Sequence, residues 1–308
     1  MVVLMKRKFL IIIEVVCVFL IIYIATSIIV WHLENKQNQK IMSSILSGDI
    51  ISDNKVMSSY NFEEIMESGE YEFFVSGENS SVEENIEITN NDVPAKVEFT
   101  NKDLLDKVVN IDYPYDSLNI KTYVINFSAL KEMNIDTIGW VKVMNTYVDY
   151  PIVQSKDNSY YLTHNFLKEY NSAGWVYADY KNNFFDLDKN TLIYGHNRRN
   201  NSMFGSLDNI LKKEWYENPE NKYIFFATTN NYYIAEIFSV YKISAEGLSI
   251  PLSFEGDNDF YDYIDTIKNR SIYNFDTPIS AVDNIITLYT CDDNNDYRIL
   301  LHAKLIKI

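Results

Sequence analysis

The chain has 308 residues, of which 47% are hydrophobic, so it is longer than one average domain and can bury a sizeable core. Its formal net charge of −16 argues against nucleic acid as a partner, because phosphate binding needs basic patches. Two cysteines and four histidines at unrelated spacings form neither a disulfide framework nor a metal-ligand motif, and the sequence has no glycine-rich phosphate loop. We therefore expect no metal and no other cofactor.

The first 31 residues predict a membrane anchor. Residues 1–8 form a basic tail, and residues 9–31 are almost wholly apolar, which is enough to span a bilayer as a helix. Because the basic cluster precedes the apolar run, we expect a single-pass protein of the cell membrane with a cytoplasmic N-terminus and the rest of the chain outside. A cleaved signal peptide is the alternative, although the run is longer than the apolar region of a typical signal.

Residues 32–120 differ in composition from the rest of the chain. They are rich in Asn, Ser and Glu, and acidic residues far outnumber basic ones between Glu63 and Glu98. Such a composition favours a flexible, self-repelling stalk or linker, with a short helix at 37–51. A small ordered subdomain is the alternative, with strands at 71–75 and 97–99.

Residues 121–308 read as short strands with a few inserted helices. The expected strands are 136–143, 147–153, 174–178, 190–194, 222–228, 232–243, 282–290 and 298–308. Helices are expected at 127–134, with Ser128 as its cap, and at 203–215 and 257–268. The fold class is therefore mainly β with added helices, as a closed β-barrel.

Three chemically suited residues lie at strand ends. The apolar run of the strand expected at 282–290 is followed directly by Cys291. Arg298 begins the next apolar run, which is the last expected strand. If these strands pair, a thiol and a guanidinium lie at the same end of a sheet, where the cation can lower the thiol pKa and hold an oxyanion. His196, after another expected strand, is the candidate base.

Each of these residues also has a structural interpretation. A lone cysteine such as Cys291 is often a small buried hydrophobe, and His196 can be a hydrogen-bonded turn residue. Arg298 can belong to a surface ion pair of little energetic weight. Their shared position at strand ends favours function, because loops on a rigid frame commonly carry it.

Several motifs resemble those of the class B sortases. The matching segments are Asn134–Trp140, Val148–Val153, Asp157–Leu162, Tyr194–Asn197, Ser202–Leu207 and Thr287–Cys291, followed by Arg298. Each motif alone is weak, but their common order and compatible spacing over residues 127–308 are specific. The resemblance implies an eight-stranded sortase-type barrel, preceded by N-terminal helices, in a catalytic domain of residues 121–308.

The resemblance also implies roles for particular residues. Cys291 matches the family's nucleophile, His196 its general acid and base, and Arg298 the arginine that holds the oxyanion or the substrate. The positions that match the substrate groove are Asn158, Leu162, Tyr194 and Tyr289. At position 289 class B members often have a serine, so the tyrosine is expected to narrow the groove.

The implied reaction is transpeptidation. Sortases cut a sorting motif of a secreted protein after threonine and transfer the acyl group, through a thioacyl intermediate, to an amine of a peptidoglycan precursor or a pilin. Two alternatives remain open on the residues alone. One is a membrane-anchored cysteine endopeptidase that uses water as acceptor, and the other is a non-catalytic, stalked surface-binding domain.

Overall fold

The structure is a computed structural model that describes residues 2–47, 50–53, 123–291 and 296–308, with the side chains of residues 2–12, 14, 47, 51–53 and 291 outside the description. The strands predicted at 71–75 and 97–99, and most of the predicted stalk, lie outside the described residues. Helix α1 (Val2–Ser47) contains an apolar stretch long enough to cross a membrane. The helix predicted at 37–51 is the C-terminal part of α1, which ends at Ser47.

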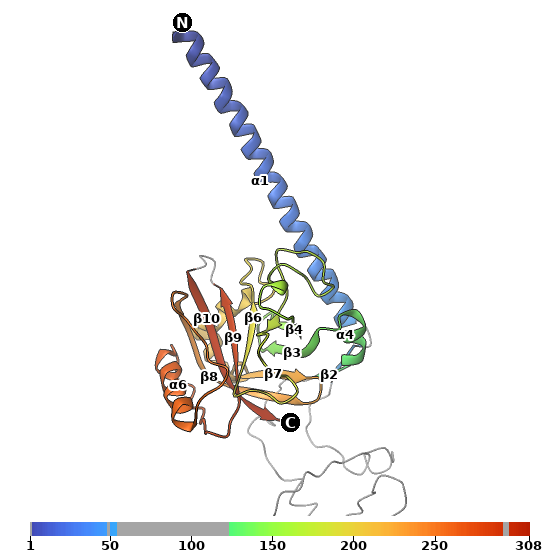
Figure 1. Ribbon diagram of the computed structural model, residues 1–308, viewed down its shortest axis with the longest axis vertical. Coiled ribbons are helices and arrows are strands. Elements are labelled where there is room, and N and C mark those ends of the chain that lie inside the picture. Colours follow the sequence, from blue (N-terminus) through green and yellow to red (C-terminus); the bar gives the residue numbers. More distant parts are fainter. Residues whose placement is uncertain (1, 48–49, 54–122, 292–295) are drawn as a thin grey trace, which may run out of the picture. The chain divides into compact units, whose positions relative to one another are not determined.

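Eight of the described strands close a barrel (Figure 1), as predicted. They are β3 (Thr137–Val143), β4 (Asp149–Val153), β5 (Tyr177–Ala178), β6 (Asn190–Gly195), β7 (Tyr223–Thr228), β8 (Tyr232–Ser244), β9 (Ile285–Cys291) and β10 (Tyr297–Lys307). Their order around the barrel is β10-β8-β7-β3-β4-β5-β6-β9. Two further strands, β1 (Ile51–Asp53) and β2 (Tyr123–Ile125), pair with each other outside the barrel.

The described helices that follow β2 are short, apart from α6. They are α4 (Phe127–Met133), η1 (Tyr160–Leu162), η2 (Gly205–Leu211), α5 (Lys213–Tyr216), η3 (Pro219–Lys222) and α6 (Asp257–Arg270). The predicted cap of α4 is wrong: Asn126, not Ser128, caps it, because the Asn126 carboxamide oxygen accepts from the Ala129 N–H at 3.0 Å. The helix expected at 203–215 is divided between η2 and α5, and the strand expected at 174–178 shortens to β5.

Helix α6 packs on the barrel through one apolar face. Phe260, Ile264 and Ile267 are buried at helical spacing, in a cluster with Phe238 of β8 and Leu300 of β10. Burial of side chains of this size stabilises the fold by about 1.5–3 kcal/mol each. The apolar stripe of α6 is therefore a packing surface.

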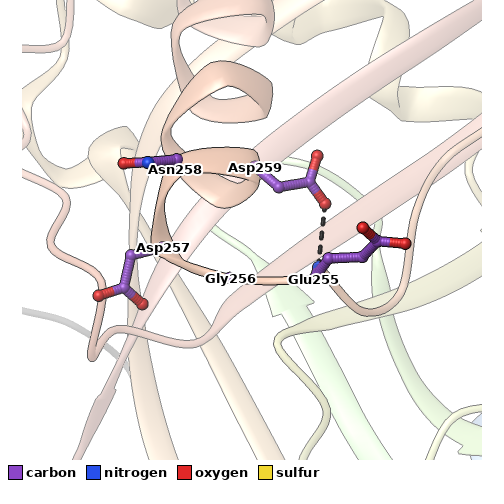
Figure 2. Close-up of a pocket in the computed structure, with 5 residues that line it drawn as sticks. All are labelled: Glu255, Gly256, Asp257, Asn258 and Asp259. Carbon is purple, nitrogen blue, oxygen red and sulfur yellow. Dashed lines mark hydrogen bonds between the residues drawn. The ribbon is translucent and has the colours of Figure 1, made fainter.

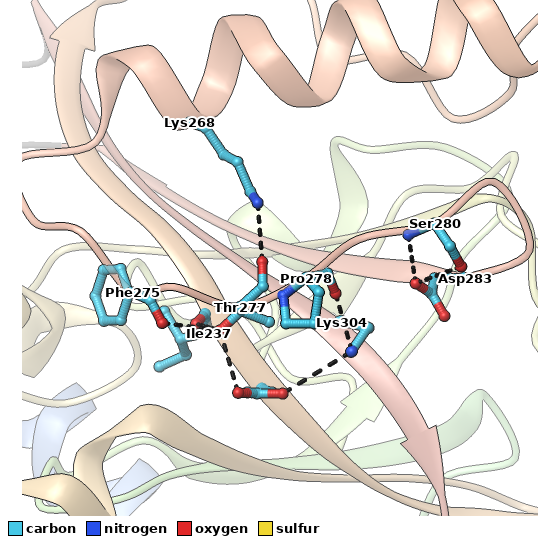
Figure 3. A network of polar contacts seen from close by, with 9 residues as sticks. Ile237, Lys268, Phe275, Thr277, Pro278, Ser280, Asp283 and Lys304 are labelled. Atoms are coloured by element: carbon cyan, nitrogen blue, oxygen red, sulfur yellow. Dashed lines mark hydrogen bonds and ion pairs between the residues drawn. The ribbon is translucent and has the colours of Figure 1, made fainter.

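The connection from α6 to β9 is tied to the barrel by polar contacts (Figure 3). The Thr277 hydroxyl donates to the Ile237 carbonyl of β8 at 2.9 Å, and Lys268 of α6 donates to the Thr277 carbonyl at 2.8 Å. Lys304 of β10 donates to the Pro278 carbonyl at 2.9 Å. This connection leads directly into β9, so these contacts fix the start of the strand that ends at Cys291.

A buried polar network links β6, β9, β10 and β8. The Thr287 hydroxyl donates to the Asn190 carboxamide oxygen at 2.8 Å, so it accepts from Nδ1–H of His302, which lies 2.9 Å away. Nε2 of His302 then accepts from the Tyr241 hydroxyl at 3.1 Å. Burial lowers the pKa of His302 to about 3, which keeps this ring neutral at physiological pH. The network pins the register of β6 against β9.

Replacement of Thr287 by valine tests this network. Thr287→Val should lower the free energy of unfolding by about 1–3 kcal/mol, because the Asn190 oxygen and the His302 N–H lose a buried partner. Thr191→Val is the matched control: its buried hydroxyl has no hydrogen-bond partner among the described residues, so valine should be neutral or stabilising there. Urea unfolding of the full chain in detergent measures both, and equal effects would contradict the prediction.

Candidate active site

The strand register brings the backbones of the three predicted catalytic residues to one end of the barrel. Strand β6 runs parallel to β9 with Gly195 opposite Thr290, and the next residues along these strands are His196 and Cys291. Strand β10 runs antiparallel to β9 with Arg298 opposite Cys291. The thiol of Cys291 and residues 292–295 lie outside the described part of the chain.

The loop that carries His196 is held on both sides. Its imidazole is half-buried, and Nε2 lies 2.8 Å from the Leu162 carbonyl oxygen, which can accept a hydrogen bond from the ring. The His196 carbonyl accepts from the Phe204 N–H at 3.0 Å. The ring of Phe204 packs so closely against Gly195 that a Cβ there would lie 2.5 Å from it. A side chain at position 195 would therefore displace the His196 loop.

Burial lowers the pKa of His196 below its ordinary value of about 6.5. The hydrogen bond to the Leu162 carbonyl opposes this shift because it favours the protonated ring, and the positive charge of Arg198 lowers the pKa further. The neutral imidazole is thus the favoured form at neutral pH. A neutral ring is suited to accept a proton, whereas proton donation would require a neighbouring negative charge.

Arg298 is oriented by aromatic and backbone groups. Its Nε donates to the Tyr289 hydroxyl at 3.0 Å and its Nη1 donates to the Tyr297 carbonyl at 2.8 Å. Its guanidinium carbon lies 5.8 Å from the centroid of the Tyr289 ring. Positions 289 and 291 share one face of β9, because residues two apart in a strand do so. Tyr289, on the same face of β9 as position 291, therefore holds the guanidinium of Arg298.

Tyrosines form a row beside this end of the barrel. The Tyr194 ring stacks on Tyr177 with centroids 5.1 Å apart and meets the Tyr289 ring edge-on at 5.3 Å. Tyr194 and Tyr289 are register partners across the parallel β6 and β9. Leu162, which is 38% exposed, lies close by, since its carbonyl contacts the His196 ring. Of the predicted groove residues, Leu162 thus contacts His196 and Tyr289 contacts Arg298.

Comparison with known proteins identifies the family. The sortase domain model matches residues 141–306. Sortase B of Listeria monocytogenes is 41% identical over 181 residues, 58% of this chain and 72% of the relative, and sortase B of Staphylococcus aureus is 35% identical over 185 residues, 59% and 75%. The structure of a Staphylococcus aureus sortase B–substrate complex matches with a TM-score of 0.56 and 35% identity, over 59% of this chain and 85% of that chain.

The chain belongs to the class B sortases. It is accordingly an enzyme, a sortase-type cysteine transpeptidase, and sortases are membrane-associated proteins. Among the residues that the structure describes, no group of three or more His, Cys, Asp or Glu is arranged to hold a metal ion.

Asp179 contacts two of the predicted groove residues and is not itself among the predicted site residues. Its buried carboxylate accepts from the Asn158 amide at 2.8 Å and from the Tyr194 hydroxyl at 2.9 Å. Desolvation and the charge of Asp179 raise the pKa of Tyr194, so this hydroxyl remains protonated. The Asn158 carboxamide oxygen accepts from the Tyr180 N–H at 2.9 Å. Asp179 directly follows an expected strand, which is the signal that could have found it in this sortase.

A separate hollow of about 540 Å³ lies at the start of α6 and is lined by residues 255–259. The Asp259 carboxylate there accepts from the Glu255 N–H at 3.1 Å (Figure 2). Carboxylates at this position are favoured by the partial positive charge of a helix N-terminus. None of the predicted site residues lines this hollow.

The titration of His196 can be measured directly. Its imidazole should titrate below about 6.5, because burial disfavours the charged ring. Since the folded pKa lies below the unfolded one, the contribution of this ring to stability is present at neutral pH and is lost as the pH falls below about 6.5. Histidine NMR signals of the full chain, assigned by their loss in His196→Gln, give the value. A pKa at or above 6.5 would contradict the prediction.

Proposed function

We propose that this sortase cleaves a sorting motif near the C-terminus of secreted proteins, after threonine, and transfers the new acyl end to an amine. The acceptor amine belongs to a peptidoglycan precursor or a pilin. The register that gathers the backbones of Cys291, His196 and Arg298 at one end of the barrel carries this proposal. Among the similar structures, one is a sortase B–substrate complex and another is sortase B complexed with triglycine. These complexes support a peptide as the first substrate and an amine-bearing ligand, such as triglycine, as the second.

In the proposed first half-reaction the Cys291 thiolate attacks the carbonyl carbon that follows threonine. Arg298 stabilises the oxyanion and aligns the peptide. When the C–N bond breaks, the His196 imidazolium gives its proton to the leaving amine, and a thioester remains on Cys291. The predicted groove residues Asn158, Leu162, Tyr194 and Tyr289 would then hold the peptide. Asn158 would do so indirectly, by positioning Asp179 and the Tyr180 backbone, because both ends of its carboxamide are bonded to them.

In the second half-reaction the incoming amine attacks the thioester carbonyl. Neutral His196 takes a proton from the amine nitrogen, the new C–N bond forms, and the C–S bond breaks to return the thiolate. The lowered pKa of His196 suits this step. The membrane topology that we propose keeps the N-terminus in the cytoplasm and the catalytic domain outside, as the basic tail before the apolar run indicates.

A peptide-ligation assay tests the reaction. The full chain in detergent, given sorting-motif peptides and triglycine, should release the C-terminal fragment and form an amide product that mass spectrometry detects. Cys291→Ala should lower the rate by at least about a thousandfold, because loss of a covalent nucleophile removes the reaction path. Cys17→Ser, at the exposed cysteine of α1, is the matched control and should retain activity. Equal release without triglycine would indicate a hydrolase, and an active Cys291→Ala would refute the proposal.

Tyr289 is expected to support the reaction through Arg298. Tyr289→Phe keeps the ring but removes the oxygen that accepts from Nε of Arg298, so kcat/KM should fall roughly tenfold, as the loss of a charged hydrogen bond predicts. Tyr297→Phe, at an exposed tyrosine of the next strand, should stay near the wild-type value. Steady-state kinetics on the same peptide separates the two, and equal values would remove Tyr289 from this role.

A further inference from the structure

The C-terminal turns of α1 carry a buried face. Asn35, Asn38, Ile41 and Ile45 are 6%, 3%, 6% and 0% exposed, and their spacing places them on one side of the helix. The preceding apolar residues of α1, from Val15 to Leu33, are exposed. One continuous helix thus consists of an exposed apolar part and a part, residues 34–45, that packs against the catalytic domain.

This contact is polar and directional. The Asn171 amide lies 3.0 Å from the Glu34 carbonyl oxygen, to which it donates, and 3.2 Å from the Asn38 carboxamide oxygen. Ser172 donates its hydroxyl and its N–H to the Glu34 carboxylate. Because hydrogen bonds between buried groups need a fixed geometry, these contacts favour one rotational setting of the helix.

One route from α1 to the His196 loop passes through Arg198. Its Nη2 donates to the Asn35 carboxamide oxygen at 3.2 Å, and its guanidinium lies 6.0 Å from the centroid of the Trp31 ring. The negative charge of Glu34 also acts on this guanidinium. Arg198 stands two residues after His196, and its backbone is packed against Gly205, where a Cβ would overlap the Arg198 carbonyl oxygen.

A second route passes through Gly174. The Asn38 amide donates to the Gly174 carbonyl at 3.4 Å. Gly174 has φ +58°, and a Cβ there would overlap the Tyr161 carbonyl oxygen and lie 2.8 Å from that of Leu162. The Leu162 carbonyl is the group that contacts the His196 ring. Both the ring and the loop of His196 are therefore supported by elements that rest on α1.

We infer that residues 31–45 of α1 belong to the active-site scaffold, and that Arg198 is a positioning residue that couples this helix to His196. The inference rests on the proposed catalytic role of His196. By this inference, the part of α1 that follows the apolar run both tethers the catalytic domain and helps to fix the position of His196. Arg198 acts through the loop and does not contact the substrate.

Kinetics of the full chain in detergent tests the inference. Arg198→Ala and Asn38→Ala should each lower kcat about tenfold with a smaller change in KM, since a displaced acid–base group loses part of its roughly 10²–10⁴-fold effect. Arg198→Lys, which keeps the charge but not the planar group, should lie between these variants and the wild type. Arg199→Ala and Lys36→Ala, at exposed neighbours, are the matched controls and should stay near wild type.

The pH profile separates positioning from general destabilisation. The charge of Arg198 lowers the pKa of His196. In a plot of kcat against pH, Arg198→Ala should therefore move the limb that reports the titration of His196 to higher pH. Arg198→Lys and Asn38→Ala should leave this limb in place while kcat falls. Variants that show wild-type kcat and an unmoved limb, like the controls, would overturn the inference.

Hydrogen exchange provides a measurement that does not depend on activity. Amide exchange over residues 196–204, followed by mass spectrometry, should quicken in Arg198→Ala and Asn38→Ala and not in the controls, because the loop loses its support. If His196→Ala stays active while exchange quickens as expected, the proposed function fails and the coupling stands. If exchange matches the controls while Cys291 and His196 prove essential, the inference fails and the proposed function stands.

Discussion

The parallel pairing of β6 with β9 is the constraint on which the candidate site depends. It sets Gly195 beside Thr290 and so brings the next residue of each chain segment to the same end of the barrel. A shift of one residue would exchange the two faces of a strand, and would separate His196 from position 291. The buried contacts of Thr287 with Asn190 and His302 oppose such a shift, because they form in one register. The buried polar network around Thr287 therefore helps to keep His196 beside position 291.

Electrostatics at this end of the barrel makes opposing demands on His196. Burial and the charge of Arg198 favour the neutral ring, whereas protonation of a leaving amine needs the imidazolium. The Leu162 carbonyl favours the protonated form and partly offsets burial. A thiolate at Cys291 would act in the same direction, since an opposite charge nearby stabilises the charged ring. A thiolate would thus keep the ring protonated until it attacks; once it is consumed, the imidazolium would become more acidic and could give its proton to the leaving amine, which couples the two proposed roles.

Part of this could be predicted from the sequence, because it depends on local pattern. The hairpin of β7 and β8, the stripe of α6 and the strand ends at Cys291 and Arg298 each follow from apolar periodicity within a few residues. Asp179 also lies at the end of an expected strand, but Arg198 left no such signal. The contact of Arg198 with Asn35 joins residues 163 positions apart, and a pattern within one segment does not encode its partner in another. Likewise Asn35 and Asn38 count toward a stalk by composition, although both are buried.

Helix α1 continues without a break from its apolar part into the part that packs on the catalytic domain. The sequence from residue 2 to residue 47 contains neither glycine nor proline, the residues that most often interrupt or kink a helix. Residues 34–47 therefore extend the apolar part as one rod of roughly 20 Å at 1.5 Å per residue. Where α1 crosses a membrane, Trp31 marks the end of the apolar run, and Arg198 lies over its ring. The loop of His196 would then stand close to the bilayer surface, since it contacts the first turns of helix that leave the lipid.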